Sequence, residues 1–160
     1  MSLKIPKTVK MVISDFDGVI TDGGIYIDQN ANISRKLNFK DIMAISLLKK
    51  AGIEVAFISG EKNSAIELIS KKFSLKEVHQ GIRIKIDVIK SIVERNGLKQ
   101  SEFLYIGDDI NDIESLNYSS IKITVPNAVD AVKKVKDIQV TTNLGGSGAF
   151  REVADCLLSD

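Results

Sequence analysis

The chain has 160 residues, of which 44% are hydrophobic and 27% are charged, the size and balance of one soluble globular domain. Its 22 basic and 21 acidic residues give a formal net charge of +1 and are interspersed along the sequence, so no nucleic-acid partner is indicated. No apolar run approaches the roughly 18 residues of a membrane span, and residues 1–10 lack the apolar core of a secretory signal, so we expect a cytoplasmic protein.

Short apolar runs rich in β-branched residues alternate with segments of helical period along the chain. This alternation predicts an α/β fold with a doubly wound, mostly parallel sheet covered on both faces. We interpret residues 1–160 as a single domain because the sequence contains no linker, repeat or low-complexity tract. The expected strands are Val9 to Ser14, Glu54 to Ser59, Glu77 to His79, Phe103 to Gly107, Ile121 to Val125 and Ile138 to Thr141.

Apolar residues at helical spacing lie between these strands and predict amphipathic helices that pack on the sheet. Ala51-Gly52 and Asn96-Gly97 are expected helix ends, since glycine accepts the left-handed conformation common there. Cys156, the only cysteine, lies in an apolar run, so we predict a small core residue and exclude an internal disulfide. The apolar stripes are Ile42, Ile45 and Leu48; Ile66, Ile69 and Phe73; and Ile86, Ile89 and Val93.

One segment after the first strand breaks the alternation. Residues 24–28 and 33–37 flank the polar run 29–32, a pattern that predicts a β-hairpin rather than a helix. A chain of this length has little sequence left for a second domain that would enclose a substrate. We therefore expect any cover over an active site to come from a small insertion or from a neighbouring subunit.

The first strand runs into an acidic motif, SDFDGVITDG, at residues 14–23. Residues i and i+2 of an extended segment project to the same side, so Asp15 and Asp17 can share one ligand. Asp and Gly are also common turn formers, so this pair alone does not distinguish a site from a turn.

A second acidic cluster follows the strand expected at 103–107. The motif GDDIND, residues 107–112, places Asp108, Asp109 and Asp112 at the edge of the sheet where ligands of doubly wound folds bind. So many carboxylates repel one another unless a cation is present, and hard oxygen ligands are those that Mg²⁺ prefers. The sequence therefore predicts a magnesium site to which a bound phosphate would add oxygens.

Two further signals fall at the same edge of the sheet. Ser59 and Gly60 end the second long strand before a helix expected to begin near Asn63, and they offer a hydroxyl and two backbone N–H groups to an anion. The same residues would also serve as an ordinary helix cap. Lys85 begins another helix beyond the short strand around Val78, where its charge would hold a phosphate and the carboxylates together.

The quartet DFDGVITDG, ISG, Lys85 and GDDIND resembles the four motifs of the haloacid dehalogenase superfamily of phosphohydrolases. TDGG before a hairpin, QG shortly before Lys85, and the tail GGSGAFRE at residues 145–152 are similar to the branch without a cap domain. That branch contains 3-deoxy-D-manno-octulosonate 8-phosphate phosphatases and 2-keto-3-deoxynononate 9-phosphate phosphatases. The resemblance covers nearly the whole chain and implies a Mg²⁺-dependent phosphomonoester hydrolase that forms an aspartyl phosphate.

The resemblance also implies roles for single residues. Asp15 would be the nucleophile and Asp17 the acid and base, while Asp15, the backbone carbonyl of Asp17 and Asp108 would bind Mg²⁺. Ser59, Gly60 and Lys85 would hold the phosphoryl group.

The resemblance leaves three features open. Asp109 and Asp112 either hold metal-bound water or cap the helix that begins there. The glycine-rich tail either approaches a phosphate or turns the chain into its last helix. Members of this branch form homotetramers in which a hairpin partly covers a neighbour's site, which makes Tyr26 and Ile27 candidate contacts.

The residue after ISG bears on the substrate. Octulosonate phosphatases usually carry Arg there, whereas this chain has Glu61, with Lys72 eleven residues later. Members of the nine-carbon branch show Glu and Lys at these positions, so the expected substrate is a nonulosonate 9-phosphate, either 2-keto-3-deoxynononate or sialic acid 9-phosphate. The alternative is 3-deoxy-D-manno-octulosonate 8-phosphate of lipopolysaccharide biosynthesis, with Glu61 a helix-entry acid and Lys72 an ordinary exposed lysine.

Other classes of protein share parts of this pattern. A signalling receiver also gathers acids, a hydroxyl and a lysine around Mg²⁺ on a doubly wound sheet, but its phosphorylated Asp follows a middle strand. A phosphomutase would need a cap that this sequence has no room for. A noncatalytic module is a third alternative, and the complete set of motifs favours an active phosphatase over it.

Overall fold

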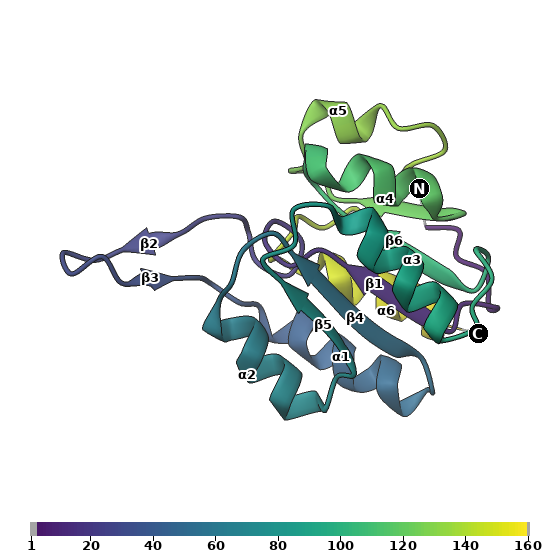
Figure 1. Cartoon of the computed structure of the whole chain (residues 1–160), viewed down its shortest axis with the longest axis horizontal. Coiled ribbons are helices and arrows are strands. Elements are labelled where there is room, and N and C mark those ends of the chain that lie inside the picture. Colours follow the sequence, from purple (N-terminus) through teal and green to yellow (C-terminus); the bar gives the residue numbers. More distant parts are fainter. Residues whose placement is uncertain (1–2, 160) are drawn as a thin grey trace.

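The structure, a computed structural model, describes residues 3–159. Within these residues a six-stranded sheet has the order β5-β4-β1-β6-β7-β8, and each neighbouring pair is parallel. Helices cover both faces of the sheet (Figure 1), which confirms the predicted doubly wound α/β fold. The sheet strands are β1 (Met11–Ser14), β4 (Glu54–Ser59), β5 (Glu77–Gln80), β6 (Phe103–Ile106), β7 (Ile121–Thr124) and β8 (Gln139–Val140). The helices are α1 (Phe39–Lys50), α2 (Ser64–Phe73), α3 (Lys85–Arg95), the 3-10 helix η1 (Ile110–Asp112), α4 (Ile113–Tyr118), α5 (Asp130–Lys133) and α6 (Ala149–Leu158).

Successive residues of β1 face opposite layers of the molecule. Val12 belongs to a core with Phe57 and Phe150, which α1, α2 and α6 cover. Ile13 belongs to a second core with Ile58 and Tyr105, which α3, α4 and α5 cover. Because both faces of the central strands are buried, these strands are apolar at nearly every position instead of alternating with polar residues.

The observed ends of the elements follow local chemistry. The helices α1 and α3 end where expected, with Gly52 and Gly97 just beyond them at φ +79° and +60°. Asn63 caps α2, since its side chain accepts a hydrogen bond from the Ile66 N–H at 2.9 Å. The first strand is shorter than predicted because the N–H of Val9 forms a turn with the Pro6 carbonyl at 3.3 Å.

The segment between β1 and α1 is the predicted hairpin, which projects from the body of the molecule (Figure 1). It consists of the antiparallel strands β2 (Tyr26–Ile27) and β3 (Ile33–Ser34), and no separate cap domain stands there. Asp28 closes its turn by accepting hydrogen bonds from the backbone N–H groups of Asn30 and Asn32 at 2.8 and 2.9 Å. Four apolar side chains of the hairpin are more than half exposed: Ile25 52%, Tyr26 63%, Ile27 62% and Ile33 54%.

Two further expectations concern the periphery. Cys156 is partly buried against the first core, and its thiol donates to the Leu3 carbonyl at 3.1 Å, so it is a packing residue at the core's margin. In the part of the chain that the structure describes, every helix is too short or too polar to cross a bilayer.

Candidate active site

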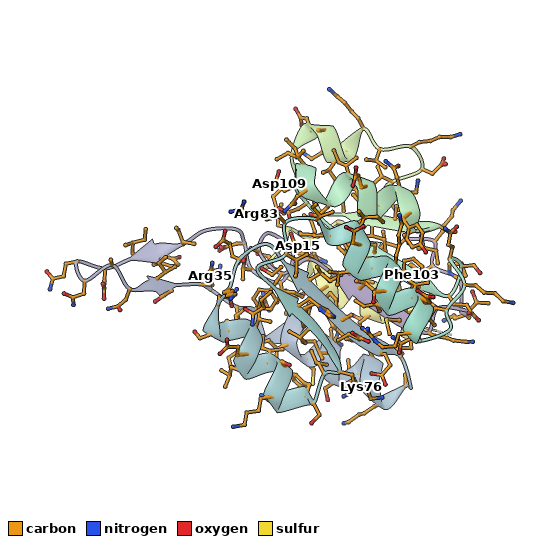
Figure 2. All side chains as sticks on the ribbon, viewed as in Figure 1. Asp15, Arg35, Lys76, Arg83, Phe103 and Asp109 are labelled. Carbon is orange, nitrogen blue, oxygen red and sulfur yellow. The ribbon has the colours of Figure 1, made fainter. Side chains whose placement is uncertain are left out.

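The carboxyl ends of β1, β4 and β6 meet at one edge of the sheet, where a cavity of about 320 Å³ opens. Figure 2 shows Asp15 and Asp109 on this side of the molecule, near the point where the hairpin leaves the body. The cavity gathers most of the predicted site residues. It is lined by Asp15, Asp17, Gly18, Gly23, Ser59, Gly60, Glu61, Asp108, Asp109 and Asn111.

Asp15 is the most deeply placed carboxylate of this cavity, with an exposed fraction of 5%. Its Oδ1 accepts a hydrogen bond from the Phe16 N–H at 2.6 Å, and its Oδ2 lies 2.8 Å from Lys85 Nζ. Burial raises the pKa of Asp15 well above its usual range and the charge of Asp112 raises it further, while Lys85 opposes both. The carboxylate is therefore held in one orientation but lacks enough positive charge around it.

Lys85 is buried between two carboxylates, with Nζ 2.8 Å from both Asp15 Oδ2 and Asp112 Oδ1. Burial lowers the pKa of Lys85, but the charges of Asp15 and Asp112 outweigh it and the net pKa is raised. Lys85 therefore remains a cation where a phosphate would meet Asp15. Asp112 Oδ1 also accepts a hydrogen bond from Tyr105 Oη at 2.5 Å.

The second acidic motif is organised by Asp112. Its Oδ2 accepts hydrogen bonds from the N–H groups of Asp108 and Asp109 at 3.0 and 3.1 Å. Asp109 in turn accepts from the Ile110 N–H at 2.7 Å, and the two acids form a capping box at η1. Of the two alternatives for Asp109 and Asp112, the contacts favour the helix cap, although Asp109 also lines the cavity.

Asp108 lies against the loop of the first motif. A Cβ atom at Gly18 would fall 2.0 Å from Asp108 Oδ2, so this approach requires glycine. Burial raises the pKa of Asp108 to about 7, and the charge of Asp112 adds to this effect. Asp108 Oδ1 is buried, and no residue from 3 to 159 donates a hydrogen bond to it.

These observations test whether the site suits a divalent metal. Carboxylate oxygens of Asp15, Asp108 and Asp112 lie within 4.8 Å of one another. A buried carboxylate oxygen with no donor, beside acids whose pKa values burial raises, is what a hard divalent cation would satisfy. The residues therefore fit such a metal.

Asp17 is held by contacts from its own loop and from the hairpin. Its Oδ1 lies 2.7 Å from Arg35 Nε and 3.4 Å from Thr21 Oγ1. Thr21 Oγ1 also accepts the N–H groups of Gly18 and Gly23 at 3.2 Å, which fixes the loop. Asp17 Oδ2 is buried without a donor in the described part of the chain, so one oxygen is held while the other is available.

The turn after β4 forms another wall of the cavity. Ser59 is buried, and its hydroxyl donates to the Glu61 carbonyl at 2.9 Å and accepts from the Glu61 N–H at 3.1 Å. This tight turn places Glu61 at the cavity wall. Opposite it, a Cβ atom at Gly60 would lie 3.6 Å from Asn111 Nδ2, so the two loops approach closely.

Arg35 and Asn111 were not predicted from the sequence as site residues. Asn111 lies within the GDDIND motif, so an amide among acids at the site edge was a usable signal. Arg35 follows β3 of the hairpin and contacts Asp17, which lies 18 positions earlier in the sequence. No local sequence pattern predicts this contact.

The structure does not bring Lys72 to the cavity. Lys72 lies eight residues after Ser64, which begins α2 beside the site, and a helix rises about 1.5 Å per residue, so the two are about 12 Å apart along its axis. Its Nζ lies 5.5 Å from the centroid of the Phe73 ring. The expectation that Lys72 and Glu61 surround the substrate together is therefore not met within one chain.

The glycine-rich tail supports the first acidic loop from outside the cavity. The Gly146 N–H donates to the Val19 carbonyl at 2.8 Å, and the Gly145 N–H donates to Asn127 Oδ1 at 2.8 Å. A Cβ atom at Gly145 would lie 1.8 Å from the Gly18 carbonyl oxygen, so only glycine permits this packing. Of the two alternatives for the tail, these contacts favour the structural one.

Comparison with known proteins identifies the family. The model of the haloacid dehalogenase-like hydrolases matches residues 78–149. The 3-deoxy-D-manno-octulosonate 8-phosphate phosphatase of Haemophilus influenzae is 30% identical over 152 residues, which cover 95% of this chain and 84% of that protein. This chain belongs to the haloacid dehalogenase-like hydrolases. The same-named phosphatase of Escherichia coli K12 is also 30% identical, over 95% of this chain and 80% of its own length.

Solved structures place this haloacid dehalogenase-like hydrolase in the branch without a cap domain. The octulosonate phosphatase of Moraxella catarrhalis, in complex with magnesium ion, phosphate ion and KDO, has a TM-score of 0.89 and 29% identity, covering 95% of this chain and 87% of its own. That of Yersinia pestis has a TM-score of 0.89 and 27% identity, covering 95% and 82%. The protein is a phosphatase, as its motifs predict.

Proposed function

We propose that this protein is a magnesium-dependent phosphatase of a 2-keto-3-deoxy sugar acid, with 3-deoxy-D-manno-octulosonate 8-phosphate as its substrate. The observation that carries the proposal is that Asp15 and Asp17 line one cavity while Lys85, buried behind it, lies 2.8 Å from Asp15 Oδ2. The relatives named for this eight-carbon substrate match almost the whole chain. The relatives do not support the nine-carbon substrate that was expected from Glu61 and Lys72. The position of Lys72, away from the cavity, does not support it either.

Asp15 is the nucleophile in this proposal. Its carboxylate oxygen forms a bond to phosphorus while the bond from phosphorus to the sugar oxygen breaks. A carboxylate that approaches a phosphate meets charge repulsion, and Lys85 reduces it from a fixed position. Asp15, Asp108 and the Asp17 carbonyl would hold Mg²⁺, which supplies further positive charge to the phosphoryl oxygens when bound.

Asp17 exchanges the protons. It donates a proton to the sugar alkoxide as that group leaves, and it later removes a proton from the water that attacks the aspartyl phosphate. The second step releases inorganic phosphate and restores the Asp15 carboxylate. We assign this exchange to Oδ2, which has no hydrogen-bond partner among residues 3–159, since Oδ1 is bound to Arg35. In the same proposal the Gly60 N–H and the Ser59 hydroxyl bind phosphoryl oxygens, and the hydroxyl turns its hydrogen from the Glu61 carbonyl to the phosphate.

The proposal includes a homotetramer. The four exposed apolar side chains of the hairpin, defined above, belong to a projecting arm, and Ile27 and Ile33 are paired across its two strands. Such an arm is suited to a neighbouring subunit rather than to water. Light scattering should show four chains, and replacing Tyr26 and Ile27 by Ser should give a smaller species. A monomer with full activity at the same concentration would contradict this part.

A substrate panel tests the activity itself. The purified protein with Mg²⁺ should hydrolyse the eight-carbon phosphate with a kcat/KM about tenfold or more above that for nine-carbon 9-phosphates, the range that one extra carbon can give. Chelation of the metal should abolish turnover of both. Glu61→Ala should reduce turnover of the preferred sugar acid far more than that of a small phosphate ester, because only the sugar reaches Glu61. Better turnover of the nine-carbon compound would overturn the substrate and leave the phosphatase activity standing.

A further inference from the structure

A second cavity adjoins the catalytic one where the hairpin meets the body of the molecule. Its volume is about 290 Å³, and Asp17, Gly23 and Glu61 line both cavities. A substrate whose phosphate lies against Asp15 would therefore extend its sugar into this second space. The lining residues are Asp17, Gly23, Ile25, Ile33, Arg35 and Glu61.

Arg35 is the basic residue of this cavity. Its side chain is 13% exposed, and its Nε is bound to Asp17 Oδ1 at 2.7 Å. Among residues 3–159, no acceptor is bound to its two terminal nitrogens, Nη1 and Nη2. A guanidinium carries five N–H donors in a plane, so Nη1 and Nη2 remain available to a group in the cavity. The geometry of two parallel N–H bonds matches a carboxylate.

The other walls limit where an anion can lie. Glu61 carries a negative charge and would repel an anion, whereas it would accept hydrogen bonds from hydroxyl groups. Ile25 and Ile33 offer no hydrogen bond to either group. A ligand with both a carboxylate and hydroxyls would thus place the carboxylate at Arg35 and the hydroxyls towards Glu61.

We propose that Arg35 binds the carboxylate of the substrate and thereby selects sugar acids over neutral sugars. This assignment rests on the proposed function, since it requires a substrate that carries both a phosphate and a carboxylate. The hairpin then contributes to its own active site through Arg35, in addition to any contact with a neighbouring subunit. Figure 2 shows Arg35 at the base of the hairpin, on the side of Asp15.

The test compares two substrates that differ in one group. They are 3-deoxy-D-manno-octulosonate 8-phosphate and its analogue in which the carboxylate is reduced to an alcohol. The readout is the ratio of their kcat/KM values, because loss of the Arg35 contact with Asp17 would affect both substrates alike. In the unmodified protein the ratio should be about 30 or more, the factor that a charge-assisted hydrogen bond commonly supplies. In Arg35→Gln it should fall close to 1.

Lys36 provides the matched control. It is the neighbouring cation, it lies 3.7 Å from Asp22, its side chain is 56% exposed, and it lines neither cavity. Lys36→Gln removes the same charge from the hairpin and should keep the ratio of the unmodified protein. If Arg35→Gln fails to fold, Arg35→Met, which keeps the apolar stem, should show the same loss of the ratio.

The outcomes separate this proposal from the proposed function. An unchanged ratio in a folded Arg35 variant would overturn the role of Arg35 while sugar acids remain the substrates. A ratio near 1 in the unmodified protein would overturn both the role of Arg35 and the sugar-acid substrate. An equal loss of the ratio in Lys36→Gln would show that only the total charge of the hairpin matters, which also contradicts the proposal.

Discussion

Each end of helix α3 has a basic residue that contacts acidic side chains. At one end the pKa values of the acids are raised, and at the other end the pKa of the acid is lowered. At its first residue, Lys85 binds Asp15 and Asp112, and Asp108 lies nearby. One lysine therefore serves three carboxylates there. Burial and mutual repulsion raise the pKa of Asp15 and bring that of Asp108 to about 7.

At its last residue, Arg95 binds a single carboxylate. Arg95 Nη2 lies 2.7 Å from Glu77 Oε2, and His79 and Asn96 add contacts to Glu77 at 3.0 and 3.2 Å. Burial raises the pKa of Glu77, but the hydrogen bonds from Arg95, His79 and Asn96 outweigh it, and the net pKa is lowered to about 2.

The difference shows which end of the helix is optimised for stability. Glu77 has more donors than it needs, so its charge stabilises the folded chain. The acids around Lys85 have too few donors, so their charges destabilise the fold until a cation is bound. The under-neutralised end is the candidate active site.

The largest effect should come from Asp15→Asn. The amide has nearly the shape of the carboxylate but cannot attack phosphorus, so kcat should fall about 10⁴-fold or more. Quench-flow measurements should show no burst of phosphoenzyme, and the circular dichroism spectrum should be unchanged. Asp22→Asn, in the same loop but outside the cavity lining, should retain turnover. Normal steady-state hydrolysis by a folded Asp15→Asn would contradict the assigned nucleophile.

The next effect concerns pH and the metal. The pKa of Asp108 is raised from 3.8 to about 7, so the folded protein favours the protonated carboxyl. This contribution to the stability of the metal-free protein is present in full below pH 3.8 and is lost as the pH rises through about 7. A cation requires the deprotonated acid, so apparent Mg²⁺ affinity should rise about tenfold per pH unit up to about 7, where it should level off. Calorimetric titration from pH 5 to 8 measures this affinity.

The same titration has an internal control. In Asp108→Asn the residual Mg²⁺ affinity should be low and its pH dependence should be weaker, since Asp15, whose pKa burial also raises, is then the titrating ligand. A Mg²⁺ affinity of the unmodified protein that stays constant from pH 5 to 7 would mean that Asp108 is not the titrating ligand.

Glu77→Gln should show the opposite pH dependence at the other end of α3. Because the pKa of Glu77 is lowered from 4.5 to about 2, its stabilising contribution is present above pH 4.5 and is lost as the pH falls to about 2. Urea unfolding at pH 7 should give a loss of about 2 kcal/mol in the free energy of unfolding, which shrinks towards pH 2. Glu54→Gln, which breaks a more exposed pair with Lys76, should change little, and an equal loss there would remove the distinction.

The sequence predicted the parts of the site that depend on the ends of strands. Asp15, Asp17 and Asp108 follow β1 and β6, and parallel strands end at the same edge, so their meeting required no knowledge of side-chain packing. The hairpin was predicted because two short segments on either side of a polar run, residues 29–32, are a local signal.

The parts that were missed depend on contacts distant in sequence. Arg35 reaches Asp17 only because the hairpin folds back over the first loop. Lys72 was expected near the substrate because the nine-carbon branch carries Glu and Lys at these two positions, but in this chain Lys72 lies near the far end of α2, away from the cavity. The support that Tyr105 gives to Asp112 was also unforeseen, since its position in β6 indicates only a core residue.

The smallest effect should come from Tyr105→Phe. The Tyr105 hydroxyl donates to Asp112 Oδ1, the same oxygen that Lys85 Nζ contacts at 2.8 Å. Without this hydroxyl, Asp112 Oδ1 attracts the Lys85 ammonium more strongly. Lys85 is then held less firmly against Asp15. We expect kcat to fall about fivefold and the free energy of unfolding to fall by about 1 kcal/mol, the usual net value of one hydrogen bond.

Tyr118→Phe makes the same chemical change beside the same core, where Tyr118 packs on Phe103 away from the acids, and it should leave kcat unchanged. Steady-state kinetics and urea unfolding of both variants measure the difference. If Tyr105→Phe loses stability without any loss of kcat, the hydroxyl supports the fold alone. A loss of kcat confined to Tyr105→Phe would instead show that the position of Lys85 depends on the Tyr105 hydroxyl. Residues buried in the sheet would then position the site together with its loops.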